Sequence, residues 1–122
     1  TDSEALFLLA LSEGLDADPL AAMERAVNRL VGLSRAHGRV PHLRLAAAFA
    51  DGKRLYAVRA ASDDRAPTLY HRWNAALGGR AVVSEPLERD EAGWTAVPPG
   101  HFCVFEGEHA QVFPFDWEAV PA

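Results

Sequence analysis

The chain has 122 residues, which is enough for one domain that buries a core without metal or disulfide staples. Its 12 basic residues form no run and are outnumbered by 17 acidic ones. The formal charge of −5 therefore argues against nucleic acid and against a membrane surface as partners. No apolar run approaches the roughly 20 residues of a membrane span. Cys103 is the only cysteine, which excludes an internal disulfide and is typical of a cytoplasmic protein.

The first eleven residues predict a helix that is apolar on every side. Thr1 and Glu4 have the spacing of a capping box, in which both side chains satisfy free N–H groups at a helix start. Residues 5–11 are apolar throughout, so we expect neighbours on nearly every side of this helix. Gly14 should end it after about Glu13. Such a helix is rarely the first element of a complete domain, and the missing initial Met indicates a processed, truncated or engineered start.

A second helix, from Asp18 to about His37, is predicted to be amphipathic. Asp18 and Pro19 supply an N-cap and a proline at the first helical position, and Gly38 follows the predicted end. Apolar residues recur at helical spacing along one face: Leu20, Met23, Val27, Leu30 and Val31. This helix should pack that face on the core and leave the opposite, polar face in water.

After Pro41 the pattern changes from helical to extended. Residues 43–50 and 55–61 flank Asp51-Gly52-Lys53, which predicts a hairpin. Both faces of these strands are apolar, and the alanine-rich face of the first suits packing against a second sheet. Further strands are expected at residues 68–73, 80–84, 101–105 and 110–115, with an exposed acidic loop at 87–93 and a turn over residues 94–100. Two helices followed by five or six strands is the order of an α+β domain.

Cys103 and His101 would share one face of a strand, where a thiol and an imidazole can act as nucleophile and base. The aromatic neighbours of Cys103 favour a buried, unreactive thiol instead. The five histidines have no spacing that completes a metal site with one cysteine, so we expect no metal. Four acidic residues could mimic a carboxylate pair, but nothing apolar near them would shift a pKa, which favours a solvated loop. They are Glu85, Glu88, Asp90 and Glu91.

A charged loop of Ser62, Asp63, Asp64 and Arg65 follows a buried strand and is a candidate site. Loops at the ends of covered strands often carry binding residues. The alternative is a turn that an Asp–Arg pair stabilises. Asp2 is a second candidate, because a carboxylate in the first turn favours the positive end of a helix and could equally hold a ligand ammonium group.

Four blocks of sequence are informative when they are taken together. They are Thr1-Asp2-Ser3-Glu4-Ala5-Leu6-Phe7, Arg54-Leu55-Tyr56-Ala57-Val58-Arg59, Ala61-Ser62-Asp63-Asp64-Arg65-Ala66-Pro67-Thr68-Leu69-Tyr70, and Val82-Val83-Ser84-Glu85-Pro86-Leu87 with Trp94 and Val97-Pro98. In this order they resemble the second half of a class II glutamine amidotransferase, of the stand-alone bacterial type. The resemblance covers essentially the whole chain.

The resemblance implies an N-terminal-nucleophile hydrolase fold, an αββα sandwich, of which residues 1–122 would be the C-terminal portion of a single domain. The family hydrolyses the side-chain amide of glutamine or a γ-glutamyl compound, without a cofactor, through an N-terminal cysteine whose α-amino group is the base. That cysteine, an Asn-Gly oxyanion pair and a substrate-binding arginine belong to the half that this sequence lacks. Only the acidic residue of the Ser/Thr-Asp-Ser/Thr-Glu motif carries over, to Asp2, which would receive the α-ammonium group of the substrate.

Alone, the chain is expected to be inactive, because the resemblance places no catalytic residue in it. An N-terminal threonine is a nucleophile in other members of this fold class, but Thr1 corresponds to an interior residue of the motif. The missing half would be the main partner, and the face that its absence leaves open should let copies of the chain self-associate. The alternative function is a non-catalytic binding or assembly module that kept the sandwich.

Overall fold

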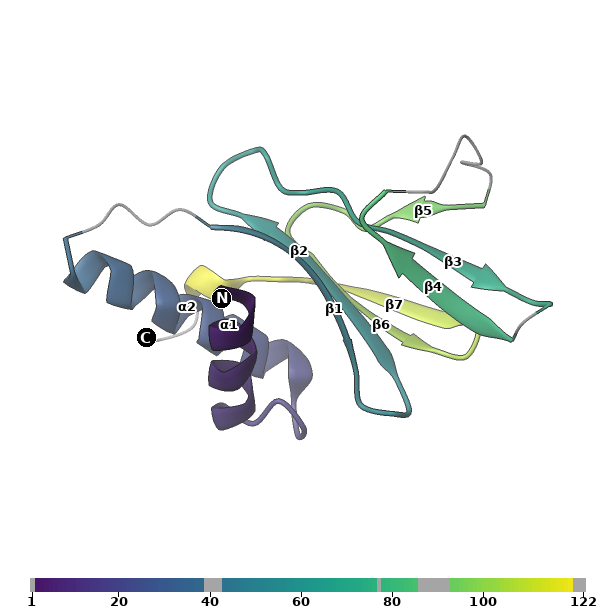
Figure 1. Ribbon diagram of the computed structural model, residues 1–122, viewed down its shortest axis with the longest axis horizontal. Helices are drawn as coiled ribbons and strands as arrows, with labels where there is room; N and C mark the ends of the chain where they lie inside the picture. The colour runs from purple at the N-terminus through teal and green to yellow at the C-terminus, as the bar shows by residue number, and fades with distance from the viewer. Residues whose placement is uncertain (1, 39–42, 77, 86–92, 120–122) are drawn as a thin grey trace. The chain divides into compact units, whose positions relative to one another are not determined.

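The computed structural model describes residues 2–38, 43–76, 78–85 and 93–119, without the side chains of residues 2–5 and 119. The chain divides into two compact units: unit 1 comprises Thr1–Leu43 with Phe115–Ala122, and unit 2 comprises Arg44–Pro114. Helices make up unit 1 and antiparallel strands make up unit 2 (Figure 1). The predicted α+β order, with two helices ahead of the strands, is confirmed.

Helix α1 (Asp2–Ser12) ends at a glycine, as the sequence predicts. Gly14 has a φ of 91°, a left-handed conformation that glycine adopts without steric cost. The N–H of Leu15 donates to the carbonyl of Ala10 at 3.0 Å, and the N–H of Gly14 donates to the carbonyl of Leu11 at 3.3 Å. These two hydrogen bonds form a Schellman motif, which satisfies carbonyl groups at the end of the helix.

The prediction that α1 is covered on nearly every side is wrong for this chain. Leu6 and Ala10 are buried, but the side chains of Phe7, Leu8 and Leu11 are 44%, 57% and 46% exposed. Within unit 1, α1 packs against α2, and one neighbouring helix covers only a stripe of another. An apolar face of α1 therefore remains on the surface of unit 1.

Helix α2 (Pro19–Ala36) begins and ends where the sequence predicts. Oδ1 of Asp18 accepts a hydrogen bond from the N–H of Ala21 at 3.3 Å, which caps the first turn, and Gly38 follows the last turn with a φ of 72°. The buried residues recur at helical spacing: Ala22, Met23, Ala26, Val27 and Val31. Burying each of the larger side chains contributes roughly 1.5–3 kcal/mol, so this face holds unit 1 together.

Two polar contacts join the segments around α2. The carboxylate of Glu13 accepts a hydrogen bond from Arg29 at 2.7 Å, and this bond is the main cause that lowers the pKa of Glu13. The backbone N–H of Asp116 donates to the carboxylate of Glu24 at 2.7 Å. Asp116 directly precedes the short helix η1 (Trp117–Ala119). This helix packs on α2, and the indole of Trp117 is buried.

Unit 2 contains two antiparallel sheets. The first has the order β1 (Arg44–Ala50), β2 (Leu55–Ala61), β6 (His101–Glu106) and β7 (His109–Pro114). The second has the order β4 (Gly79–Val83), β3 (Tyr70–Asn74) and β5 (Thr95–Ala96). The described residues thus form seven strands, where five or six were predicted, and each expected strand is present with its bounds shifted by a few residues.

The predicted hairpin of β1 and β2 is confirmed. Gly52 takes a φ of 89° in its turn. Oδ1 of Asp51 accepts from the N–H groups of Arg54 at 2.7 Å and Lys53 at 2.9 Å, while Oδ2 accepts from the hydroxyl of Tyr56 at 3.0 Å. These bonds, led by the one from the backbone of Arg54, hold the pKa of Asp51 below its ordinary value.

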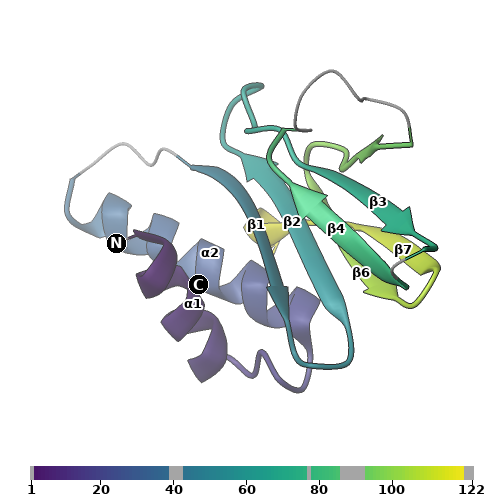
Figure 2. The same cartoon turned by 45° about the vertical axis from the view of Figure 1, so that its right-hand side comes forward.

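The two sheets of unit 2 pack face to face (Figure 2), as the alanine-rich strand face predicts. Their shared core joins Ala57, Cys103 and Phe105 of the four-stranded sheet to Leu69 and Val97, which flank β3 and β5. The opposite face of the four-stranded sheet also carries buried side chains: Tyr56, Val58, Ala60 and Phe102. The prediction that both sides of the β1–β2 hairpin are covered is therefore confirmed for β2.

No helix in the described part of the chain is long and apolar enough to cross a membrane. The capping residue Thr1 lies outside the described residues, and so does most of the predicted acidic loop, residues 86–92.

Candidate functional site

The two candidate sites from the sequence stand in different units. Asp2 is the first residue of α1, so its backbone position at a helix start agrees with the prediction. Its side chain lies outside what the structure describes, and its role as a contact for a substrate ammonium group stays a prediction. The charged loop belongs to unit 2 and can be described in full.

The loop of residues 62–67, which follows β2, is held by a carboxylate. Oδ2 of Asp63 accepts from Nη2 of Arg44 at 2.9 Å, and Oδ1 accepts from the backbone N–H of Arg65 at 3.0 Å. An Asp–Arg pair was one of the two predicted interpretations of this loop. The partner is an arginine of β1, 19 residues away, instead of the adjacent Arg65. Ser62 and Asp64 are exposed in the same loop.

Arg59 fixes the far end of this loop, and the sequence analysis missed it. Its guanidinium donates to three backbone carbonyl groups: Pro67 at 2.7 Å, Val97 at 2.8 Å and Ala66 at 3.2 Å. Its own carbonyl accepts from the N–H of Gly100 at 2.7 Å. The only sequence signal was one arginine within a strand that is otherwise apolar on both faces.

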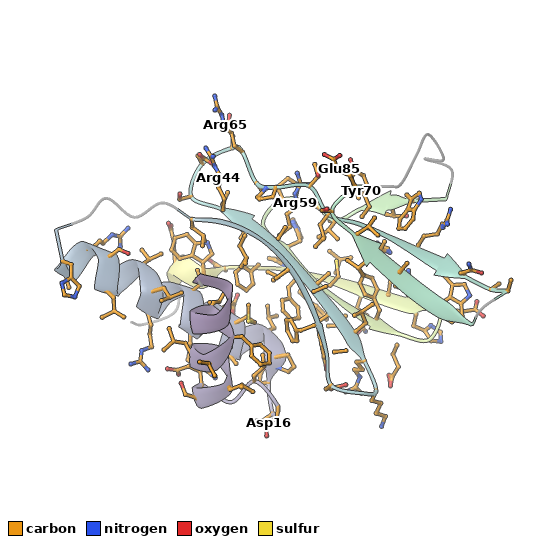
Figure 3. The ribbon with its side chains drawn as sticks, in the orientation of Figure 1. Asp16, Arg44, Arg59, Arg65, Tyr70 and Glu85 are labelled. Carbon is orange, nitrogen blue, oxygen red and sulfur yellow. The ribbon has the colours of Figure 1, made fainter. Side chains whose placement is uncertain are left out.

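Three arginines thus gather at one end of unit 2. Arg44 and Arg59 lie beside the loop of residues 62–67, and Arg65 is part of this loop (Figure 3). Two of them hold the loop through Asp63 or through carbonyl groups, whereas no hydrogen bond of the Arg65 guanidinium is found among the described residues. The arrangement can bind a polar or anionic small molecule through donors on a rigid loop.

The Cys103 thiol is buried between the two sheets, which confirms the predicted burial. Burial raises the pKa of Cys103, and the charge of Arg80 only partly opposes that shift. Nδ1 of His101 lies 2.9 Å from the carbonyl of Pro99, so this nitrogen carries a proton and leaves Nε2 as the acceptor of the ring. The burial and the raised pKa of Cys103 therefore leave this thiol unsuited to act as a nucleophile.

In the described part of the chain, no group of three or more His, Cys, Asp or Glu side chains is placed to hold a metal ion. Glu85 is exposed just after β4, and the other acidic candidates lie outside the described residues: Glu88, Asp90 and Glu91.

A second polar cluster, which the sequence analysis also missed, lies between the sheets of unit 2. Nη1 of Arg80 lies 2.9 Å from Nδ1 of His71, which is only 8% exposed. A guanidinium can only donate, so Nδ1 accepts and the imidazole is neutral. Burial is the main cause that lowers the pKa of His71, followed by the charge of Arg80. The guanidinium also stacks on Phe105, with its central carbon 4.6 Å from the ring centroid.

The same cluster contains two buried donors that find no acceptor among the described residues. They are Nε of Arg80 and Nε1 of Trp73, two residues that are paired in the register of β3 and β4. A buried N–H without a partner costs about 1–3 kcal/mol. An incoming carboxylate or carbonyl group would relieve this cost.

The chain is similar to one solved structure in particular. That protein is described as a glutamine aminotransferase class-II domain protein from Silicibacter pomeroyi. The two share 57% sequence identity with a TM-score of 0.85, over 94% of this chain and 52% of the other. The chain therefore spans about half the length of the structure that it matches. No family model matches the chain, and no curated protein sequence does.

Proposed function

We propose that the chain is the C-terminal portion of a class II glutamine amidotransferase domain, which hydrolyses the side-chain amide of glutamine or of a γ-glutamyl compound. The observation that carries this proposal is the 57% identity to the Silicibacter pomeroyi protein over 94% of the chain. The four sequence blocks, which resemble the same class, agree with it. The 52% share of the matched structure agrees with a portion of a domain.

The proposed fold of the whole domain is the αββα sandwich of N-terminal-nucleophile hydrolases. Unit 2 would supply part of the two inner sheets, which pack against each other through Ala57 and Cys103. Unit 1 would supply one of the helical layers. The nucleophilic cysteine, its α-amino base and the oxyanion donors would come from the portion that precedes this chain. Cys103 is unsuited to that role because its thiol is buried and its pKa is raised.

In this proposal Asp2 binds the substrate and takes no part in bond breaking. Its carboxylate would receive the α-ammonium group of glutamine and so place the side-chain amide near the nucleophile. The thiolate would then attack the amide carbon, and the base would deliver its proton to the departing ammonia. The loop of residues 62–67, held by Arg59 and Arg44, stays a separate candidate site within unit 2.

A fusion tests the proposal. The part of the Silicibacter pomeroyi protein that has no counterpart in this chain is placed ahead of residue 1, and glutamate and ammonia are measured after incubation with glutamine. Asp2→Asn should lower kcat/KM roughly 10- to 150-fold, mainly through KM, because a contact with a charged group is worth about 1.5–3 kcal/mol. Asp16→Asn, a matched change in the exposed turn after α1, should leave activity unchanged. A folded fusion without activity, or an Asp2→Asn variant with full activity, would contradict the proposal.

The isolated chain gives a second test. Because the nucleophile would lie elsewhere, the 122 residues alone should release no glutamate from glutamine. Turnover that Thr1→Ala abolishes would instead assign the nucleophile to Thr1.

The alternative is a non-catalytic binding or assembly module. Its support is that the charged residues of the candidate loop mainly hold the loop itself, as Asp63 and Arg59 do. The intact mass of the natural protein separates the two functions. A preceding segment that begins with cysteine after removal of Met supports the enzyme, whereas a native start at Thr1 supports the module.

A further inference from the structure

Arg80 places a positive charge between the two sheets of unit 2 beside neutral partners. It projects from β4, an edge strand of the three-stranded sheet, and its guanidinium lies over the ring of Phe105 in the other sheet. Nη1 lies 2.9 Å from Nδ1 of His71, and Nη2 donates to the carbonyl of Glu108 at 3.1 Å. In the described part of the chain, Arg80 is not among the residues that form ion pairs with a carboxylate. A partly buried cation in this position favours an anion as its neighbour.

Two N–H groups of the same cluster have no acceptor among the described residues. They are Nε of Arg80 and Nε1 of Trp73, and both atoms are buried. The two residues are paired directly in the register of β3 and β4, so their side chains stand next to each other on one face of the sheet. The central carbon of the guanidinium lies 5.9 Å from the centroid of the indole ring. One small acceptor group can therefore serve both donors.

The groups around Arg80 leave the cluster with a single positive charge. His71 is neutral because its Nδ1 accepts from a guanidinium, and burial followed by the charge of Arg80 lowers its pKa. Burial raises the pKa of Cys103, so this thiol stays protonated. Glu108 contributes its backbone carbonyl to the cluster. A bound water could accept from both free donors but would leave the charge of Arg80 unbalanced, whereas a monovalent anion would do both.

The cluster extends from the core of unit 2 to its surface. His71 is 8% exposed, whereas Arg80 and Trp73 are half-buried. The hydrogen bond from Arg80 to the carbonyl of Glu108 lies at the exposed end, in the turn between β6 and β7. The two free donor atoms are closed off from solvent in this structure. A ligand therefore enters when Arg80 releases that one carbonyl group at the surface.

We propose that Arg80 and Trp73 form a binding site for a small carboxylate anion. One carboxylate accepts hydrogen bonds from Nε of Arg80 and Nε1 of Trp73 and balances the charge of the guanidinium. A carboxylate fits better than a halide, because its two oxygens can each accept from one of the two side chains. The site lies wholly within unit 2, and it goes beyond the proposed function without depending on it.

Titration of the 122-residue chain with acetate tests the inference by NMR. The three tryptophans each give one indole N–H signal, and they are Trp73, Trp94 and Trp117. The signal of Trp73 should move downfield and saturate, because its N–H gains an acceptor. The other two signals should stay in place and serve as internal controls. Acetamide has the shape of acetate without its charge, and it should produce no saturable shift.

Two variants show whether both donors are needed. Trp73→Phe keeps an aromatic ring without the N–H, and acetate binding is then followed at the Nε signal of Arg80. Arg80→Lys keeps a charge but lacks the Nε donor, and binding is followed at the indole of Trp73. Each variant should weaken acetate affinity at least about tenfold, as expected for the loss of a hydrogen bond to a charged group. Trp94→Phe is the matched control and should bind as the unchanged chain does. Circular dichroism must show an intact fold for each variant to count.

Several outcomes would overturn the inference. They are the absence of a saturable shift at Trp73, an equal shift with acetamide or with chloride, and unchanged acetate affinity in the folded Trp73→Phe and Arg80→Lys variants. The same titration of the fusion with the Silicibacter pomeroyi part locates the source of the acceptor. A Trp73 signal that still responds to acetate supports a small-molecule site. A signal that no longer responds overturns it, because the acceptor would belong to the polypeptide.

Discussion

Replacing Arg59 by methionine tests whether this residue holds the candidate loop in place. The change removes three hydrogen bonds to the carbonyl groups of Pro67, Val97 and Ala66, but keeps most of the apolar stem. At about 1 kcal/mol of net stabilisation for each bond, the free energy of unfolding should fall by about 3 kcal/mol. Urea unfolding at pH 7, followed by circular dichroism, measures this difference directly.

Two further variants make the result specific. Arg59→Lys keeps a charge but cannot direct three donors from one planar group, so it should recover only about a third of the loss. Arg65→Met removes an exposed guanidinium from the same loop and should change stability by less than about 0.5 kcal/mol. If Arg59→Met were as stable as the unchanged chain, the three bonds would not hold the loop, and the explanation of its rigidity would be wrong.

Three further predictions concern the two units. The Cys103 thiol should react with a disulfide reagent at least about 100-fold more slowly in the native chain than in urea, because reaction requires opening of the sheets. Burial and Arg80 lower the pKa of His71, so the unfolded chain takes up its proton first. Stability should therefore be complete above about pH 6.5 and fall as the pH drops below that value, and His71→Gln should flatten this dependence in urea unfolding between pH 7.5 and 5. Leu8→Ser on the exposed face of α1 should reduce self-association and the binding of a hydrophobic dye without lowering the urea midpoint.

The elements that the sequence predicted well are those with local signals. Asp18 and Pro19 start α2 through a side-chain cap and a fixed φ, both of which act within one turn. Gly14 ends α1 and Gly52 turns the first hairpin, because each occupies a left-handed conformation. Signals of this kind depend on neighbours within about five residues, and a single sequence contains them in full.

The contacts around the candidate site could not be predicted, because they join residues far apart in the sequence. Arg59 reaches Val97 across 38 residues, and the partner of Asp63 is Arg44 instead of an arginine of its own loop. An arginine in a strand can donate to carbonyl groups or to water. Which of the two it does depends on the distant segment of the chain that lies beside its guanidinium. The sequence located the loop correctly as an exposed, charged segment but could not say what holds it.

The first-turn position made Asp2 a candidate for binding an ammonium group, but its role with a glutamine substrate came from the resemblance alone. A carboxylate in the first turn of a helix occurs commonly as a cap, so its position alone does not distinguish substrate binding from helix stabilisation. The contact between Arg80 and His71 was missed because no local sequence signal places an arginine between two sheets.

Each unit carries one exposed apolar surface in its described residues. In unit 1 this surface is formed by Phe7, Leu8 and Leu11 on α1, and in unit 2 it is formed by both faces of β7. Natural edge strands are usually short, charged or covered, so a stand-alone module would be expected to protect an edge of this kind. The proposed function explains such exposure by a portion of the domain outside this sequence, and the chain spans 52% of the matched structure. If the proposed function is right, restoring that portion protects the exposed face of α1.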